Sequence, residues 1–506
     1  MPSNKEKRIF KNTALLYFRM AFSMILGIYT SRIVLQALGV SDYGVFNVVG
    51  GVTTMFLFLN GSMSVSTSRF ISYEIGQNNK EHIAIVYNQA RLIHWGIALI
   101  IFILIETIGL WFLNTNMNIP EDRMFAANCV LQTVAITTVL NIIATPDMAL
   151  VISHERMNSF AYISILDSIL RFLFTYFLLS YDNDRLILYA ILMMFIQITD
   201  RLFYLIYCLR HFKETRTKIK FYPRIFKSML SFAGWNVLGN LALIAIDQGI
   251  NIVLNIFCGT IVNAARGIAA QISNYTSAFV TNIRMAINPQ ITKSYANGDM
   301  AFMIKLIKYS SLSCYYILLL IAVVLYWIID YILAIWLIEV PQYTSLFINL
   351  TLIYLIVNSF ANPIIIGIHA TGDIKKFQIV EGCIMLMTLP LAYIMLKLGY
   401  PPYCVYLAQI IIAIMAQIGR LYVILPKLNI KFHTYIVSTI TPAIKVAAIT
   451  IIASVATSTL KYVLSGIGYN LAQCIITTIV CSLSIIFIGL NKAERMYIYN
   501  ILRKRI

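Results

Sequence analysis

Charged side chains inside long apolar stretches are the residues of this chain that can do chemistry. Arg32 lies within the first apolar stretch, Asp247 near the middle of the seventh, and Arg266 in the eighth. An ionisable group in a membrane span costs roughly 3 kcal/mol or more, and it normally faces a bundle interior or a water-filled cavity. We therefore expect these three side chains to line a cavity.

Taken together, the first, second, seventh and eighth stretches hold more arginine than acid. Its planar guanidinium binds phosphate through two parallel hydrogen bonds and keeps its charge at every physiological pH. The pattern predicts a binding site for an anionic group, formed by Arg19, Arg32, Arg69, Arg266 and Arg284. For Arg69, near the end of its stretch, an interhelical ion pair or an interfacial position is the competing interpretation.

Three further charges are candidates for a coupling ion or a cavity charge. Asp167 and Arg171 are four residues apart, so they share one face of a helix and either neutralise each other or face a cavity. Asp247 either joins the anion site or binds a coupling proton or sodium ion.

The elements that must hold these groups are membrane helices. The chain is 59% hydrophobic and only 12% charged, against about 25% in a soluble domain. Apolar runs of about 20 residues, the length of a bilayer span, recur throughout the chain. We expect an all-α integral membrane protein with fourteen spans, roughly at residues 13–38, 45–72, 90–113, 124–151, 159–180, 186–210, 229–257, 262–291, 305–337, 344–368, 376–398, 402–425, 436–462 and 467–490.

The net charge of +18 reflects topology rather than nucleic-acid binding. Lysine and arginine collect in every second loop, most densely at Arg210–Lys227, whereas the alternate loops hold Arg123 and Arg185 beside acids such as Asp42 and Asp184. This is the positive-inside distribution, and it places both termini in the cytoplasm.

A faint internal repeat divides the chain. About 220 residues separate Gly39 from Gly259, Ser72 from Thr292, and Asn78 from Gly298. Each half then has six spans, which enter the membrane in the same direction and are related by an axis along the membrane normal. We expect an N-lobe at 1–210, a basic cytoplasmic linker at 211–228, a C-lobe at 229–426, two extra spans at 427–490 and an amphipathic cytoplasmic tail at 491–506.

Signatures of enzymes and metal sites are missing from the sequence. There is no GxxxxGK[ST], HExxH or GxSxG motif, and the eight cysteines neither form a CxxC nor join a histidine at metal-ligand spacing. We therefore expect a protein that is not an enzyme and binds no metal or other cofactor.

The stretch from Thr30 to Phe46, TSRIVLQALGVSDYGVF, resembles the first-helix and turn motif of Wzx-type polysaccharide flippases of the MOP (MATE-like) superfamily. The serine-rich second span, which ends at Arg69–Gly76, and the arrangement of six, six and two spans are similar to that family as well. The resemblance implies two six-helix lobes that open alternately to either side of a bacterial inner membrane.

The implied substrate is an oligosaccharide of O-antigen, capsule or exopolysaccharide on a polyprenyl pyrophosphate, moved from the cytoplasmic to the periplasmic leaflet. Of the cationic cavity residues, the motif carries only Arg32; the others are placed by the repeat and by depth. Implied partners are membrane lipids and a polysaccharide polymerase complex. Neutral partners expected for the sugar are Ser62, Ser64, Ser66, Asn236, Asn240, Gln271 and Asn274.

Four alternatives stay open on the sequence alone. A flippase for a peptidoglycan precursor of the lipid II type would also have fourteen spans, whereas a multidrug MOP antiporter usually has twelve and binds cations. A membrane glycosyltransferase or ligase of polysaccharide assembly belongs to a different class and normally needs a large extramembrane loop. A non-transporting scaffold of the assembly complex would have no need of arginines within its spans.

Overall fold

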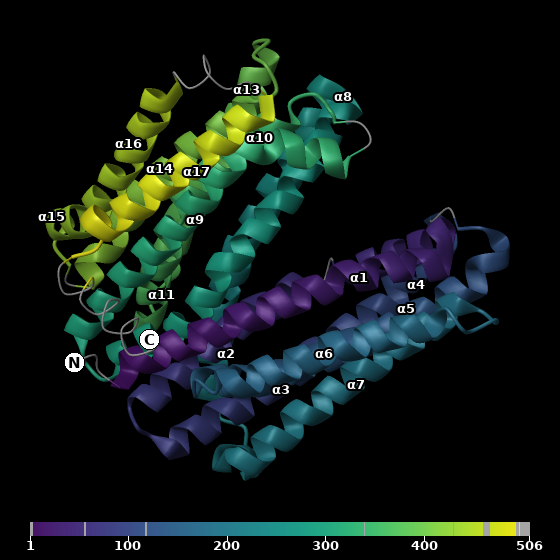
Figure 1. The fold of residues 1–506 in the computed structure, drawn as a ribbon. Coiled ribbons are helices and arrows are strands. Elements are labelled where there is room, and N and C mark those ends of the chain that lie inside the picture. The colour runs from purple at the N-terminus through teal and green to yellow at the C-terminus, as the bar shows by residue number, and fades with distance from the viewer. Residues whose placement is uncertain are drawn as a thin grey trace, which may run out of the picture. The chain divides into compact units, whose positions relative to one another are not determined.

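The computed structural model describes residues 4–54, 57–116, 119–337, 340–428, 430–458, 466–491 and 495. Within them every regular element is a helix, as the sequence predicts (Figure 1). The expected tail at 491–506 lies outside the described residues, apart from Asn491 and Arg495. The chain divides into two compact units, Lys7–Asn240 and a second unit that contains Leu241–Ile506.

The first unit contains a series of long helices joined by short turns. They are α1 (Asn4–Thr54), α2 (Leu57–Gly76), α3 (Lys80–Leu104), α4 (Leu110–Asn116), α5 (Met124–Ser153), α6 (Met157–Leu178) and α7 (Arg185–His211), followed by the start of α8 (Pro223–Ala296). A π-turn, η1 (Ile105–Gly109), joins α3 to α4, and short 3₁₀ turns lie at η2 (Glu121–Arg123) and η3 (Lys213–Arg216). Its core packs α5 against α7, with α3 alongside α5.

The second unit continues α8 and adds the remaining helices. They are α9 (Met300–Trp336), α10 (Thr344–Asn358), α11 (Ala361–Thr371), α12 (Lys375–Leu386), α13 (Thr388–Lys397), α14 (Cys404–Lys427), α15 (Phe432–Tyr435), α16 (Thr441–Ala456) and α17 (Gly466–Ser484), with π-turns at η4 (Ile436–Ile440) and η6 (Ile485–Gly489). Helices α16 and α17 pack on each other and on α9, so the two extra spans belong to this unit (Figure 1).

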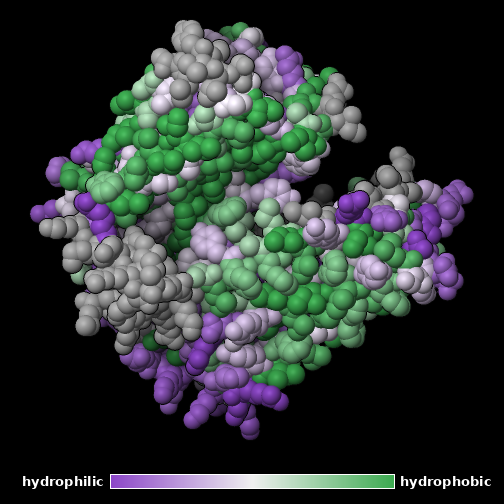
Figure 2. All heavy atoms as spheres, in the orientation of Figure 1, coloured by the Kyte–Doolittle hydropathy of each residue, from purple (hydrophilic) through white to green (hydrophobic). Residues whose placement is uncertain are grey.

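Twelve helices in the described part of the chain are long and apolar enough to cross a membrane, and they correspond to twelve of the fourteen expected spans. The other two expected spans, 45–72 and 262–291, are also helical where the structure describes them but more polar. The second of them carries Asn263, Gln271, Asn274 and Asn282. Hydrophobic side chains such as Leu99 and Ile103 are exposed on the helix sides, as lipid contact requires, and Figure 2 shows this apolar surface.

Two glycines divide the longest helices. Helix α1 has 51 residues, about 75 Å of helix, which is far longer than the hydrocarbon core of a bilayer. It is interrupted at Gly39, with φ 73° and ψ 172°, and α8 is interrupted in the same way at Gly259, with φ 79° and ψ −175°. Only glycine adopts this conformation readily, because a Cβ atom would clash with the backbone.

The same spacing of 220 residues recurs where the next helices begin. Asn78 and Gly298 both have positive φ, at 55° and 73°. Asn79 then caps α3 by accepting from the His82 amide, and Asp299 caps α9 by accepting from the Phe302 amide. Equivalent positions thus adopt the same backbone geometry, which confirms the internal repeat predicted from the sequence.

Three prolines lie close to breaks in the helices. A proline ring clashes with the carbonyl four residues before it. The break between α10 and α11 falls at Ser359–Phe360, ahead of Pro363, and the break between α12 and α13 falls at Met387, ahead of Pro390. Pro442 lies in the first turn of α16, whereas α5 and α8 continue through their prolines.

Candidate functional site

The first unit contains a half-open cavity of about 230 Å³ with a mostly apolar lining. Ser23, Gly27, Thr30 and Val34 contribute one wall; their spacing of three and four residues places them on one face of α1. The rest of the lining comes from the turn after Gly39 and from α6 and α7, through Tyr43, Ser168, Arg171, Tyr189 and Met193. The cavity therefore presents hydroxyl groups and one guanidinium within an apolar bundle.

A cluster of charges lies next to this cavity. The Asp167 carboxylate accepts from Arg171 Nε at 2.8 Å, so the pair expected from their spacing is formed. The carboxyl group of Asp200 on α7 lies beside that of Asp167. Two carboxylates in contact repel each other, and a shared proton removes that repulsion. Asp167, Arg171 and Asp200 therefore form one charged cluster between α6 and α7.

Arg32 lies on a different face of α1 from the cavity. It is two positions from both Thr30 and Val34, which is more than half a helical turn away from either. Its side chain is exposed, and it forms no hydrogen bond or ion pair with another residue in the described part of the chain. Seven residues, about 10 Å of helix, separate it from the bend at Gly39. Arg32 is thus a cation within a membrane-spanning helix, and it has no counter-charge among the residues that the structure describes.

The two other candidate arginines of this unit have contacts within it. The Arg19 guanidinium reaches the Ser164 hydroxyl at 3.4 Å and lies over the Phe160 ring at 4.9 Å. Arg69 on α2 faces three aromatic rings, with its guanidinium carbon 4.6 to 5.6 Å from their centroids. Those rings belong to Phe70, Tyr73 and Phe232. Such stacking stabilises a buried guanidinium without neutralising it.

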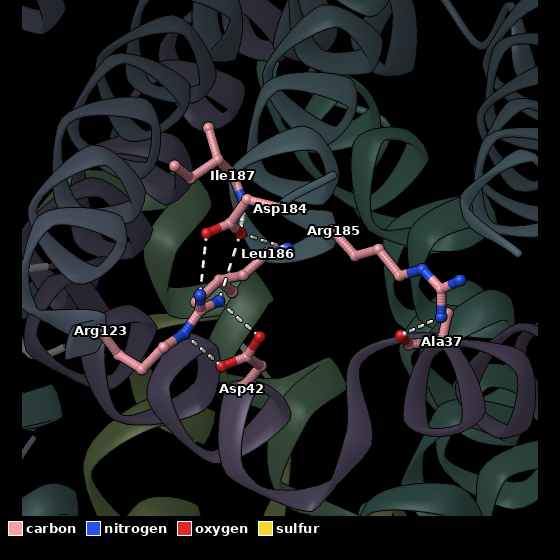
Figure 3. Close-up of polar contacts among 7 residues, drawn as sticks. All are labelled: Ala37, Asp42, Arg123, Asp184, Arg185, Leu186 and Ile187. Atoms are coloured by element: carbon pink, nitrogen blue, oxygen red, sulfur yellow. Dashed lines mark hydrogen bonds and ion pairs between the residues drawn. The ribbon is translucent and has the colours of Figure 1, made fainter. Parts of the chain in front are cut away.

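The turn that follows Gly39 is fixed by an ion-pair network (Figure 3). Arg123 at the start of α5 donates from Nε to Asp42 at 2.8 Å and from Nη1 to Asp184 at 2.9 Å. Arg185 donates to the Ala37 carbonyl at 3.2 Å. These charged residues of the alternate loops thereby connect the first helix pair to α5 and α7.

This network alters the ionisation of Asp184, which lies outside the spanning helices. Burial by itself raises the pKa of a carboxyl group, but hydrogen bonds from Arg123 and from the Ile187 amide outweigh that effect, and the pKa of Asp184 is lowered. A lowered pKa means that the carboxylate stabilises the fold above its ordinary pKa of about 4, and that this contribution is lost as the pH falls below that value.

We expect Arg123→Ala to lower the free energy of unfolding of the first unit by roughly 2 kcal/mol, because two charge-assisted contacts disappear from a partly exposed site. Thermal unfolding in detergent measures this loss. The difference from wild type should shrink on acidification, since protonated Asp184 no longer gains from Arg123. The exposed Arg156→Ala is the matched control; an equal loss there, or a difference that persists in acid, contradicts the assignment.

A second ion pair lies deeper in the first unit. Asp147 on α5 is 1% exposed, and it accepts from Arg201 on α7 and from the Tyr87 hydroxyl on α3. The backbone carbonyl of Asp147 lies 3.6 Å from the Cys208 sulfur. Asp147 and Arg201 lie in different expected spans, and nothing in the sequence indicates that they pair. This contact joins the three central helices of the unit.

Arg266 and Asp247, expected as separate cavity charges, form an ion pair in the second unit. Arg266 also donates from Nε to Asn251 at 2.6 Å and from Nη2 to the Asp247 carbonyl at 3.1 Å. The Arg266 side chain is 7% exposed, whereas that of Asp247 is 61% exposed. Asp247 therefore neutralises the buried Arg266 while it stays exposed, and its second carboxylate oxygen accepts from Gln248 Nε2 at 3.3 Å.

Two more arginines of the second unit have local partners. Arg420 on α14 pairs with Glu381 on α12 and donates to Gln417 at 3.1 Å. It lies 219 residues after Arg201, so the last helix of each repeat carries a paired arginine at an equivalent position. Arg284, a predicted substrate ligand, lies beside the Cys314 thiol.

Several of the neutral side chains expected to bind the sugar form hydrogen bonds within the first unit instead. Asn240 donates to the Ser62 hydroxyl at 2.7 Å, and Ser66 donates to the Met229 carbonyl at 3.1 Å. These bonds connect α2 to the start of α8. Within the part of the chain that the structure describes, no group of three His, Cys, Asp or Glu side chains is placed to hold a metal ion.

Comparison by sequence finds no protein-family model and no curated protein that matches the chain. Comparison by structure finds transporters. An outward-facing multidrug resistance MATE family transporter of the MOP superfamily superposes with a TM-score of 0.74 and 14% identity, over 84% of this chain and 96% of that one. MATE in the bent conformation gives 0.73 with the same identity and coverage.

A third similar structure is a MOP superfamily transporter from Pyrococcus furiosus, with a TM-score of 0.70, 14% identity and coverage of 84% and 96%. Its description reports a reversed polarity of the binding pocket and suggests a different function for that protein. The likeness to these structures extends over most of the chain, and it shows that the chain has the MATE-like fold expected from the sequence.

Proposed function

We propose that this multi-pass membrane protein is a flippase that moves a polyprenyl-pyrophosphate-linked oligosaccharide between leaflets by alternating access. The observation that carries the proposal is Arg32, an exposed cation in a spanning helix that has no counter-charge among the described residues. Such a group requires water or an anion in place of protein partners. A pyrophosphate, the part of the substrate that lipid excludes most strongly, matches it in charge and in hydrogen-bonding geometry.

The chain as a whole favours an anion over a cation. Helix α8 carries Arg266 and Arg284 against one acid near them in sequence, Asp247, which is already paired with Arg266. The proposal places the reaction in a bacterial inner membrane, with both termini in the cytoplasm and transport from the cytoplasmic to the periplasmic leaflet. A polysaccharide polymerase complex would then receive the product.

Multidrug export is the second candidate, because one similar structure is a multidrug resistance transporter. Cationic drugs require acidic or aromatic cavities, and Arg32 would repel them. A reversed pocket polarity is described for another transporter of the same fold, so the fold accommodates both kinds of pocket. Drug-efflux assays in a sensitive strain distinguish the two candidates.

Export complementation tests the flippase. We expect wild type to restore surface glycan in a strain that lacks its own flippase but makes the matching lipid-linked glycan, and Arg32→Ala to reduce it at least tenfold. Losing a bidentate charged contact of about 2 kcal/mol accounts for a change of that size. Surface glycan and the membrane level of the protein are measured together.

The controls separate charge from folding. Arg32→Lys keeps the charge without the planar fork, so partial rescue shows that charge dominates over geometry. The exposed Arg210→Ala removes a cation at the end of α7 and should export normally. Full export by Arg32→Ala at wild-type abundance contradicts the site, and failure of wild type with every matching glycan contradicts the flippase.

Coupling to protons is part of the proposal, and it rests on the contact between Asp167 and Asp200. Proton uptake lets the two acids share a hydrogen bond, whereas release leaves two negative charges beside one Arg171. The two protonation states therefore favour different packings of α6 against α7. Alternating access needs such a differential preference, because a ligand shifts an equilibrium only through unequal binding to its two states.

A further inference from the structure

The segment that follows α7 is bound to the first unit rather than hanging free between helices. Asn88 on α3 donates to the Thr217 hydroxyl at 2.9 Å and to the Lys218 carbonyl at 3.4 Å. Gln89 donates to the Lys220 carbonyl at 2.7 Å and accepts from the Tyr222 amide at 3.1 Å. Two buried amide side chains thereby hold the backbone of residues 217–222 along α3.

The start of the same segment caps the C-terminus of α7. Arg216 donates to the Leu209 carbonyl at 2.7 Å and to the Arg210 carbonyl at 3.3 Å. Cations at a helix C-terminus stabilise the carbonyls left without partners there. Glu214 lies 3.6 Å from His154 Nε2, and the interaction with that imidazole keeps the pKa of Glu214 below its ordinary value. Glu214, the acidic residue of the segment, is therefore already paired within the first unit.

What remains exposed is positive and apolar. The side chains of four basic residues are exposed and form no hydrogen bond or ion pair with another residue that the structure describes: Lys218, Lys220, Arg224 and Lys227. No acidic residue follows Glu214 until Asp247. Exposed apolar side chains alternate with these cations: Ile219 is 39% exposed, Phe221 59% and Tyr222 37%.

This mixture fits the boundary between lipid headgroups and acyl chains. Lysine and arginine stems lie along apolar surface while their charges reach the headgroups, and aromatic rings favour the same depth. A basic side chain near an anionic leaflet contributes about 1 kcal/mol, so several of them select acidic lipids. Figure 2 shows hydrophilic side chains gathered around the ends of α3 and α7 where this segment lies.

We propose that residues 217–227, the basic strap, bind the phosphate headgroups of anionic phospholipids and fix the first unit to that leaflet. The strap is held by Asn88 and Gln89, so lipid contact acts on α3 directly. The partner is a lipid surface, and the proposal holds for any cargo of the transporter.

Quenching by brominated lipids tests it with the full chain in nanodiscs. Phe221→Trp places a reporter in the strap, and the signal of the five native tryptophans is recorded without that substitution and subtracted. At equal content we expect brominated phosphatidylglycerol to quench the reporter about fivefold more than brominated phosphatidylcholine, the preference that one basic residue supplies. Adding Lys218→Gln, Lys220→Gln and Arg224→Gln should bring the two lipids to near equality.

A matched triple substitution removes the same net charge elsewhere. Lys375→Gln, Lys376→Gln and Lys431→Gln change exposed residues of the second unit and should leave the reporter's preference intact. Equal quenching by both lipids with the strap unaltered overturns the proposal, and so does an equal loss in the control. Loss of the preference on addition of inorganic pyrophosphate, but not of sodium chloride at matched ionic strength, would assign the strap to a soluble phosphate ligand instead.

Discussion

Arg201→Ala should lower the free energy of unfolding by about 3–5 kcal/mol, the largest effect on stability expected for this chain. The substitution leaves the Asp147 carboxylate, 1% exposed, without its counter-charge in a low-dielectric interior. The Tyr87 hydroxyl remains as its one described side-chain donor. Thermal unfolding in detergent and the yield of folded protein measure the effect.

A double-mutant cycle distinguishes the lost pair from lost packing. Asp147→Asn in the Arg201→Ala background removes the unpaired charge, so stability should recover in part, and the two substitutions should be strongly non-additive. Arg210→Ala on the same helix is the control, because that side chain is exposed and has no described ion pair. Additive effects of the two substitutions, or a loss below 1 kcal/mol, would show that the ion pair contributes little to stability.

Ion pairs that the sequence predicts differ from those that it misses in how far apart the two residues lie along the chain. Asp167 and Arg171 are four residues apart, and helical geometry alone brings them together. Asp147 and Arg201 are 54 residues apart on α5 and α7, so their contact depends on which helices pack and at what rotation. Asp247 and Arg266 lie on either side of the bend at Gly259, and only that bend brings them within reach.

The internal repeat can be predicted from the sequence because it also depends on local geometry. Glycine at 39 and 259 and the caps at 79 and 299 reflect local backbone demands, which leave a mark on sequence even where side chains have diverged. The cavity is harder to predict from the sequence, because Tyr43 and Tyr189 meet there only through the packing of the helices. Serine and threonine are common in membrane helices, so the residue type alone does not indicate that Ser23, Thr30 and Ser168 line the cavity.

The strongest functional effect beyond Arg32 is expected from Asp200→Asn, which should abolish the response of transport to a proton gradient. Asparagine keeps the size of the side chain and can still donate a hydrogen bond to Asp167, but it cannot take up or release a proton. Each pH unit across the membrane supplies about 1.4 kcal/mol per proton, equivalent to a factor of about ten in the transport equilibrium. Transport of a lipid-linked pyrophosphate substrate in proteoliposomes, with and without a pH gradient, measures this response.

Asp182→Asn, on an exposed loop acid, is the matched control and should keep the full gradient response. Asp167→Asn should remove the response as well, and it should also destabilise α6, because Arg171 loses its partner. The Asp200→Asn protein should still equilibrate substrate without a gradient, which separates a coupling defect from a binding defect at Arg32. A gradient response that survives in Asp200→Asn, or one that follows sodium instead of protons, would move coupling away from this acid pair and toward the exposed carboxylate of Asp247.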